Sequence, residues 1–391
     1  MFIAPWSGIL FSFSLLFLFL SLIVKKPKYK REFFPPVSVI SWFWKDGNIV
    51  ERKIKNFLSL NYPGKFEIII IDNASDDETC NICTKYAKMG KIKYFRVVKP
   101  YDRKAYALDE AIKKVAKYNI LAMTDPDGIC EKDWLAKIVQ PFKDEKVGAV
   151  IGLTHCGNFY KNFFTKMRAV EDEWFYVISP LGRQSKVDVN LVCGANYAVR
   201  REALRKVNYH GKKTLAEDFE LTIKLHNKGY DVKVTDASVW QEEVESLGEY
   251  IRQRLRWQGA SVEGFWNYAR EILRIFKLKP SGWFFFNLSY AISLFSLIYL
   301  LLAAYGWFFS FRALVFSILG WLVLNLSITV GLKKVSRSDL IKYVPFYLLV
   351  EPLLSTFIFA IVIGLKLVGK KILWRSLHDK YYHSGTRIVM K

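Results

Sequence analysis

Three short polar clusters follow one another in this 391-residue chain, and their residue types suit a group-transfer site. They are Asp125-Pro126-Asp127, Ala216-Glu217-Asp218 and Gln253-Arg254-Leu255-Arg256-Trp257. The acidic pair could hold a divalent cation together with a diphosphate. A further carboxylate could take a proton from an attacking hydroxyl, and the third cluster could bind an acceptor. Long apolar runs flank the clusters, so we expect this chemistry to take place against a membrane.

Each cluster also has an ordinary structural explanation. Asp-x-Asp pairs are frequent in solvated loops. Asp218 precedes an amphipathic pattern and could simply cap a helix. Gln253, Arg256 and Trp257 share one face of a predicted helix, which would equally suit a helix at the membrane surface with its Arg and Trp among the head groups. Only the joint occurrence of the clusters favours a site.

Strand and helix patterns alternate ahead of the first cluster and predict a sheet that positions it. Apolar strand patterns cover residues 37–41 and 66–71, with a helical pattern at 49–60 between them, which makes a βαβ unit. A strand, a helix and a strand follow at 91–98, 105–118 and 119–124. Asp72 and Asp125 each come directly after a strand. Ligands bind at that edge in open α/β sheets.

Four long apolar runs outside this region predict membrane helices. They cover residues 2–24, 283–309, 313–332 and 344–365. Basic residues follow the first run and none precedes it; they are Lys25, Lys26, Lys28, Lys30 and Arg31. The positive-inside rule therefore predicts an anchor with residue 25 onward in the cytoplasm, whereas a cleaved signal peptide would have the reverse order of charge.

The last apolar run leaves two questions open. Glu351-Pro352 interrupts it, and this carboxylate either faces protein in a Pro-kinked helix or lines a product path. Four spans that start outside would place the tail outside, but basic residues at 366, 370, 371 and 375 favour the cytoplasm. The run is therefore either a full span that breaks the rule, which we favour, or a re-entrant segment.

Composition narrows the function classes. The net charge of +22 comes from scattered basic residues, many of them beside the apolar runs, and no nucleic-acid-binding pattern accompanies them. A surface near anionic lipid, acting on an anionic nucleotide donor, explains the charge better. The Cys80-Asn81-Ile82-Cys83 spacing lacks a second ligand pair, so we expect the five cysteines to be reduced thiols rather than a metal or redox site.

The order of these motifs over residues 37–259 resembles the membrane-bound family 2 glycosyltransferases with a GT-A fold, which include cellulose, chitin and hyaluronan synthases and ceramide glucosyltransferase. The resemblance implies an α/β, Rossmann-like GT-A domain in the cytoplasm plus α-helical transmembrane segments. The implied division is 1–24 as an N-terminal transmembrane helix, 25–36 as a basic linker, 37–262 as the GT-A domain, 263–282 as an interfacial helical segment, 283–332 as a transmembrane hairpin, 343–368 as a transmembrane or re-entrant helix, and 369–391 as a basic tail.

The same resemblance implies roles for individual residues. Asp218 would be the catalytic base. Donor binding would fall to Asp72, Lys104, Asp125, Asp127 and Arg256. Acceptor binding would fall to Gly194, Glu217, Gln253 and Trp257. Asp127 and Asp125 would hold Mg²⁺ or Mn²⁺. One departure is Trp42-Phe43-Trp44-Lys45-Asp46, where the family has Pro-x-Tyr-Asn-Glu: Asp46 could replace the Glu, whereas Lys45 replaces the Asn, so the resemblance does not assign the donor contacts at that edge.

The implied activity is inverting, metal-dependent transfer from a nucleotide diphosphate sugar, with a UDP-sugar favoured, to a polysaccharide or a membrane lipid. The product would have a β-linkage. An oligomer or an accessory subunit would be needed if a polymer is exported, because the predicted spans are few. We expect no nucleic-acid partner, and a multi-pass protein of the plasma membrane if the source is prokaryotic. The alternative is a non-catalytic scaffold or lipid-binding protein, and a transporter is disfavoured by the large cytoplasmic insert.

Overall fold

We describe the protein from a computed structural model. It describes residues 3–184, 189–214, 216–280, 282, 287, 292–370 and 388–390. The predicted span at 283–309 therefore lies partly outside the described residues, as do Lys371 and Arg375 of the basic tail.

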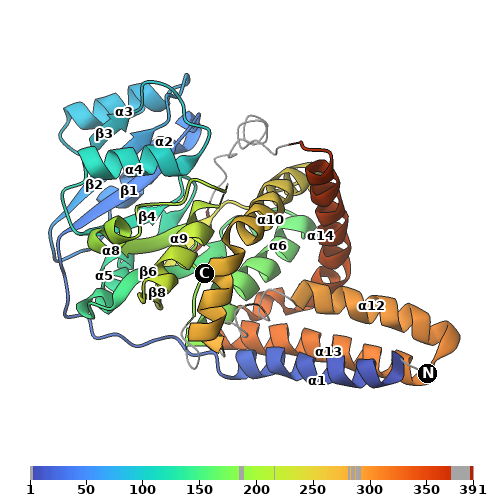
Figure 1. Cartoon of the computed structure of the whole chain (residues 1–391). Helices are drawn as coiled ribbons and strands as arrows, with labels where there is room; N and C mark the ends of the chain where they lie inside the picture. The colour runs from blue at the N-terminus through green and yellow to red at the C-terminus, as the bar shows by residue number, and fades with distance from the viewer. Residues whose placement is uncertain are drawn as a thin grey trace.

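An eight-stranded mixed sheet forms the centre of the molecule (Figure 1). Its strands are β1 (Val37–Phe43), β2 (Phe66–Asp72), β3 (Lys93–Arg96), β4 (Ile120–Thr124), β5 (Ile129–Cys130), β6 (Val147–Cys156), β7 (Asn196–Arg200) and β8 (Asp231–Gln241). The order across the sheet is β3-β2-β1-β4-β7-β6-β8-β5. Strands β1 to β4 are parallel, as are β6 and β8, whereas β7 runs antiparallel to both of its neighbours and β5 pairs antiparallel with β8.

The register of the sheet brings separate polar segments to one edge. β4 ends at Thr124, and this residue pairs with Asn196 at the start of the antiparallel β7. Asp125 N–H also donates to the carbonyl of Ala195 at 3.4 Å. The acidic pair after β4 therefore lies beside the loop that precedes β7, although about 70 residues separate the two in sequence.

Helices cover both faces of the sheet. Strand residues alternate between the faces, so Val37 and Val39 of β1 enter one core cluster while Ile40 and Trp42 enter the other. The helices of the first cluster are α2 (Gly47–Leu58), α3 (Thr79–Lys88) and α5 (Trp134–Ile138). Those of the second are α4 (Lys104–Lys114), α6 (Phe163–Asp172), α7 (Ser179–Gln184), α8 (Arg201–Lys206) and α9 (Glu217–Asn227), with the π-helical segment η2 (Glu173–Ile178).

Three apolar helices continue the second core away from the sheet. α1 (Ile3–Leu22) packs along α13 (Phe311–Lys334), and α12 (Ile292–Phe309) contacts both (Figure 1). α1 and α13 run parallel. Phe11 of α1 contacts the ring of Phe316 near the start of α13, and Lys334 Nζ at the end of α13 donates to the carbonyl of Leu22 at the end of α1. By length and composition, 311–334 and 338–367 could each cross a membrane, and two shorter apolar helices cover 11–22 and 294–309.

α14 (Val344–Leu367) contacts α6 and α10 as well as the apolar helices α12 and α13 (Figure 1), and Ser296 of α12 donates to the carbonyl of Leu348 at 2.6 Å. Phe346 contacts the ring of Phe163 on α6, Ser355 accepts a hydrogen bond from Gln258 at 3.1 Å, and Lys366 lies over the ring of Trp266 at 5.1 Å. These contacts run from one end of α14 to the other. The helix continues through Pro352 without a break.

The long helix α10 (Leu247–Leu278) runs through the predicted boundary at 262/263. It begins with a capping box at Ser246 and kinks at Tyr268, where φ is −124°. The segment predicted as an interfacial helix has a packed side and an exposed side: Tyr268 packs against Ile223 of α9, while Trp266 is 79% exposed. The expected strands and helices before residue 125 are confirmed, with the helix predicted at 105–118 ending early at Lys114. All five cysteines are free.

Candidate active site

A cleft of about 420 Å³ opens at the carboxyl edge of the sheet. Its walls come from the ends of β1 and β4, the loop before β7, the first turn of α9 and the first turns of α10. The predicted site residues that line it are Lys104, Asp125, Asp127, Gly194, Glu217, Asp218, Gln253, Arg256 and Trp257. The fold thus brings together clusters that are up to about 130 residues apart in sequence.

Asp218 is held by two backbone groups and does not act as a side-chain cap of its own helix. Its Oδ2 accepts from Gly194 N–H at 2.8 Å, and its Oδ1 accepts from Phe219 N–H at 2.8 Å. A Cβ at position 194 would lie 3.2 Å from the same carboxylate, so the glycine allows this close approach. Burial and the neighbouring charge of Glu217 raise the pKa of Asp218 to about 6.

Lys104 links the acidic pair to the second cluster. Its Nζ contacts Asp125 Oδ1 at 2.5 Å and Glu217 Oε1 at 3.7 Å. Burial alone would lower the pKa of this lysine, but the carboxylates raise it, so it stays charged. Asp127 is 5% exposed, and its Oδ2 accepts from Glu242 N–H at 3.1 Å.

The charge balance of the cleft fits a bound cation better than a bare anion. Nine carboxylate side chains line it against four cationic ones. Among the described residues no group of three or more His, Cys, Asp or Glu side chains forms a ready cage for a metal ion. A cation held here would take one or two carboxylates from the chain and its other ligands from phosphate or water, which is the usual environment of Mg²⁺.

The third cluster forms the wall that α10 contributes. Gln253 Oε1 is buried, and Arg256 is half-buried; neither group has a hydrogen-bond or ion-pair partner among the described residues. Trp257 is half-buried beside them. An amide oxygen, a guanidinium and an indole are thus available to a ligand on one face of this helix.

A buried ionic network behind this wall was not predicted from the sequence. Arg168 of α6 pairs with Glu171, with Asp172 at 3.2 Å and with Glu243 at 2.8 Å, and Glu171 also pairs with Arg254. The guanidinium of Arg254 lies between two rings, at 4.9 Å from the centroid of Tyr250 and 4.7 Å from that of Trp257. The network therefore fixes the helix that carries the third cluster. The only sequence sign of this network was a second arginine, Arg254, two residues before Arg256.

Replacing Arg168 with methionine is expected to lower the free energy of unfolding by about 3–5 kcal/mol, because three buried carboxylates would lose their shared partner. Urea unfolding in detergent, followed by tryptophan fluorescence, measures the change. Arg205→Met, at an exposed position of α8, should change the value by less than about 0.5 kcal/mol. Equal effects of the two substitutions would show that the network contributes nothing specific.

Asp72 is the one predicted site residue that the structure does not bring to the cleft. It is fully buried at the end of β2, where its carboxylate accepts from Ser75 N–H at 2.8 Å, Tyr94 Oη at 2.6 Å and Arg96 at 3.1 Å. An Asp followed three residues later by Ser75 is a sequence pattern that is compatible with such a local turn. Asp46 instead reaches the cleft from the end of β1.

Comparison with known proteins identifies relatives of the central region. A family model described as "Glycosyltransferase like family 2" matches residues 35–260. The "Probable glycosyltransferase YdaM" of Bacillus subtilis is 28% identical over 239 residues, which is 59% of this chain and 57% of that protein. The "Beta-monoglucosyldiacylglycerol synthase" of Nostoc sp. is 29% identical over 266 residues, 65% of this chain and 56% of that protein.

Two further similarities extend the comparison. The "Poly-beta-1,6-N-acetyl-D-glucosamine synthase" of Staphylococcus epidermidis is 28% identical over 254 residues, 63% of this chain and 60% of that protein. The chain thus spans 56 to 60% of the length of these three relatives. A mannosyltransferase from Pyrobaculum calidifontis, solved with GDP-Man and Mn²⁺, superimposes with a TM-score of 0.58 at 22% identity, over 90% of this chain and 98% of that one. The predicted GT-A-like fold is confirmed.

Proposed function

The chain belongs to the family 2 glycosyltransferases, and on that premise we propose that it is a membrane-embedded, inverting transferase that moves a sugar from a nucleotide diphosphate donor to a lipid or polysaccharide hydroxyl. The observation that carries the proposal is the shared cleft, in which Asp125, Asp127 and Asp218 face the α10 wall. The family relatives named above make glycolipids and β-linked polysaccharides, which supports both acceptor classes.

The residues of the cleft divide into a donor part and an acceptor part. Asp125 and Asp127 would hold the divalent ion, which when bound neutralises the donor diphosphate and its developing charge as it leaves. Arg256 would contact the diphosphate, and Lys104 would stay paired with Asp125 to orient it. We favour a UDP-sugar. The structural relative was solved with GDP-Man and Mn²⁺, so guanine donors belong in the test as well.

Asp218 would take the proton of the acceptor hydroxyl as its oxygen bonds to the anomeric carbon. The bond from that carbon to the diphosphate breaks on the opposite face, and the configuration inverts to a β-linkage. The backbone N–H groups of Gly194 and Phe219 hold the carboxylate, which keeps it in position. Gln253 and Trp257 would bind the acceptor, one by hydrogen bonding and the other by stacking. Glu217 and the loop at Gly194 would complete this acceptor side.

The rate is expected to depend on pH through Asp218. Its carboxylate accepts a proton only when ionised, and its raised pKa of about 6 places the change near neutrality. We expect kcat/KM to fall about tenfold for each pH unit below 6 and to level off above about 7. In Glu217→Gln the acid limb should move to lower pH, because one of the two causes of the raised pKa is removed. An unchanged limb would contradict the assignment of the base.

We further propose that α1, α12 and α13 cross the membrane while α14 lies along the catalytic domain at its surface. The contacts of α14 with Phe163, Gln258 and Trp266 along its length support this arrangement, and its hydrogen bond from Ser296 of α12 places it beside the spans as well. With three spans, the basic C-terminal ends of α13 and α14 would lie on the same side of the membrane as the catalytic domain. The positive-inside rule makes this side the cytoplasm. Glu351 of α14 is 7% exposed and bonds Ser355, as expected for an inward-facing carboxylate.

The test incubates membranes that contain the protein with labelled UDP- and GDP-sugars, with and without a chelator, and then sizes the product and tests its solubility in organic solvent. A chelator-sensitive product supports the proposal. A ladder indicates polymerisation, which would call for an oligomer or an accessory subunit, and one lipid-soluble spot indicates single transfer. If none of the labelled donors is turned over, the result would instead favour a non-catalytic scaffold.

A further inference from the structure

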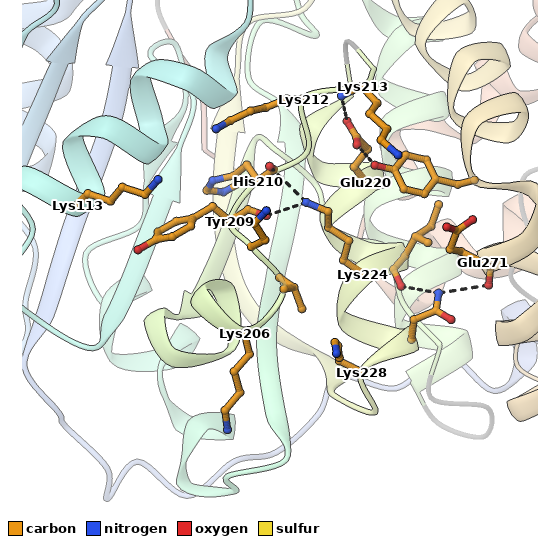
Figure 2. A pocket seen from close by; sticks show the side chains of 15 residues that line it. Lys113, Lys206, Tyr209, His210, Lys212, Lys213, Glu220, Lys224, Lys228 and Glu271 are labelled. Carbon is orange, nitrogen blue, oxygen red and sulfur yellow. Dashed lines mark hydrogen bonds between the residues drawn. The ribbon is translucent and has the colours of Figure 1, made fainter.

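A second pocket, of about 540 Å³, lies beside the last turns of α9, whereas the cleft lies at the first turn of that helix (Figure 2). Six lysines line it, with two carboxylates, Glu220 and Glu271. The lysines are Lys113, Lys206, Lys212, Lys213, Lys224 and Lys228. They come from α4, α8, α9, the loop between α8 and α9, and the residue that follows α9, so separate elements converge to make this surface.

One of the two carboxylates is already occupied by the protein. Glu220 accepts from the backbone N–H of Lys213 at 2.8 Å, from that of Thr214 at 2.9 Å, and from the hydroxyl of Tyr268. A Cβ at Gly211 would come within 2.1 Å of this side chain, so only glycine fits there. Glu220 thus holds the loop in place with three hydrogen bonds, while its negative charge remains in the pocket.

Most of the lysines lack a carboxylate partner. Lys206 pairs with Glu202 at 2.9 Å and Lys212 with Asp109 at 3.4 Å. The other four make no ion pair with the described residues; they are Lys113, Lys213, Lys224 and Lys228. Figure 2 shows Lys224 directed at the carbonyls of the central loop, to which it donates at 3.1 and 3.4 Å.

Helix ends explain only part of this positive charge. Lys113, Lys206 and Lys224 lie in the last turns of α4, α8 and α9, where a cation is favourable. The C-terminus of each helix carries about half a negative charge. Three such ends therefore offset less than two of the six positive charges of the lysines. Lys212 and Lys213 lie in a loop, where no helix end accounts for them.

The loop contains one strained residue. Asn208 (φ 58°) lies just after the C-terminus of α8, where a left-handed asparagine is common, but Tyr209 (φ 63°) is a bulky residue in the same left-handed region. Such strain persists only where surrounding contacts fix it, and it concentrates at ligand sites. Here the loop is tied by Lys224 on one side and by His210, which bonds Asp109 at 2.7 Å, on the other.

We propose that this pocket binds a ligand with at least two phosphate groups, separate from the donor in the cleft. Its volume suits a compound of nucleotide size. The source is a solute rather than a lipid head group, because the pocket lies on the Tyr268 side of α10 while the exposed Trp266 and Leu273 lie on the opposite side of the helix. A bound ligand would join α4, which begins at Lys104, to α9, which begins with Glu217 and Asp218.

The test titrates pyrophosphate into the full-length protein in detergent, with a chelator present and in an Asp127→Ala background, so that the cleft contributes no metal-dependent binding. Isothermal titration calorimetry should give a Kd that rises at least about tenfold in K113Q/K213Q/K228Q. The matched control K85Q/K88Q/K91Q removes three exposed lysines that line neither pocket, and it should stay within about twofold. This result holds whether or not sugar transfer is detected.

Two outcomes would overturn the proposal: no pyrophosphate binding by the parent protein, or equal losses in the two triple variants. If the pocket variant unfolds at a lower temperature than its control, K228Q alone, at an exposed position, should still weaken binding about threefold. Titration of glycerophosphoglycerol, the water-soluble head group of phosphatidylglycerol, tests the other source. Head-group binding that only the pocket variant loses, without any pyrophosphate binding, would assign the site to lipid and overturn the soluble ligand.

Discussion

Replacing Asp218 with asparagine is expected to lower kcat for sugar transfer by about 10²–10⁴-fold, the usual contribution of a positioned general base. Asparagine keeps the shape and can still accept from Gly194 or Phe219, so the loss would report the missing charge and proton acceptor rather than a collapsed loop. Nucleoside diphosphate release from purified protein, under saturating donor and acceptor, measures the effect. Donor affinity should change by less than about threefold, since the carboxylate acts on the acceptor.

The control for this experiment is Asp231→Asn, which removes a carboxylate that pairs with Lys279 at 3.0 Å away from the cleft. Its turnover should stay within about twofold of the parent. Retention of full activity by Asp218→Asn would rule out this residue as the base.

Replacing Asp127 with alanine is expected to reduce turnover by about 10²–10³-fold and to remove its response to added Mg²⁺ or Mn²⁺. The carboxylate is the more deeply placed of the acidic pair, whereas Asp125 is paired with Lys104. Turnover measured across a metal titration, in parallel with donor binding, gives both quantities.

Asp127→Asn is the matched variant, because it separates charge from hydrogen bonding. The asparagine oxygen can still accept from Glu242 N–H, a bond of 3.1 Å in the parent, whereas alanine leaves that group unpaired. Both variants should lose turnover, and only the alanine variant should also lose stability. Normal turnover in Asp127→Asn would mean that the residue supports the fold and not the cation.

Local patterns were enough to predict the strands and helices at the front of the sheet. A βαβ order fixes which strands are parallel, and parallel strands end at one edge, so the position of Asp125 followed from the sequence alone. Asp72 shares that edge but is absent from the lining of the cleft, because its carboxylate closes a local turn with Ser75 and bonds Arg96.

Long-range pairing was beyond such patterns. Glu171 meets Arg254 across 83 positions and Glu173 meets Arg337 across 164, and nothing in the spacing of either residue marks its partner. The packing of α14 could not be predicted from local patterns either. Its apolar composition is that of a span, and the sequence does not show that it contacts α6 and α10 as well as α12 and α13.

The length of α10 has a consequence for the acceptor. One rigid helix carries Trp257 in the cleft and the exposed Trp266 nine residues further on, a rise of about 14 Å. If the second tryptophan rests among lipid head groups, the first is kept at a constant height above them. The helix then fixes the distance between the acceptor side of the cleft and the membrane surface, and we expect this distance to limit which acceptor hydroxyls can reach Asp218.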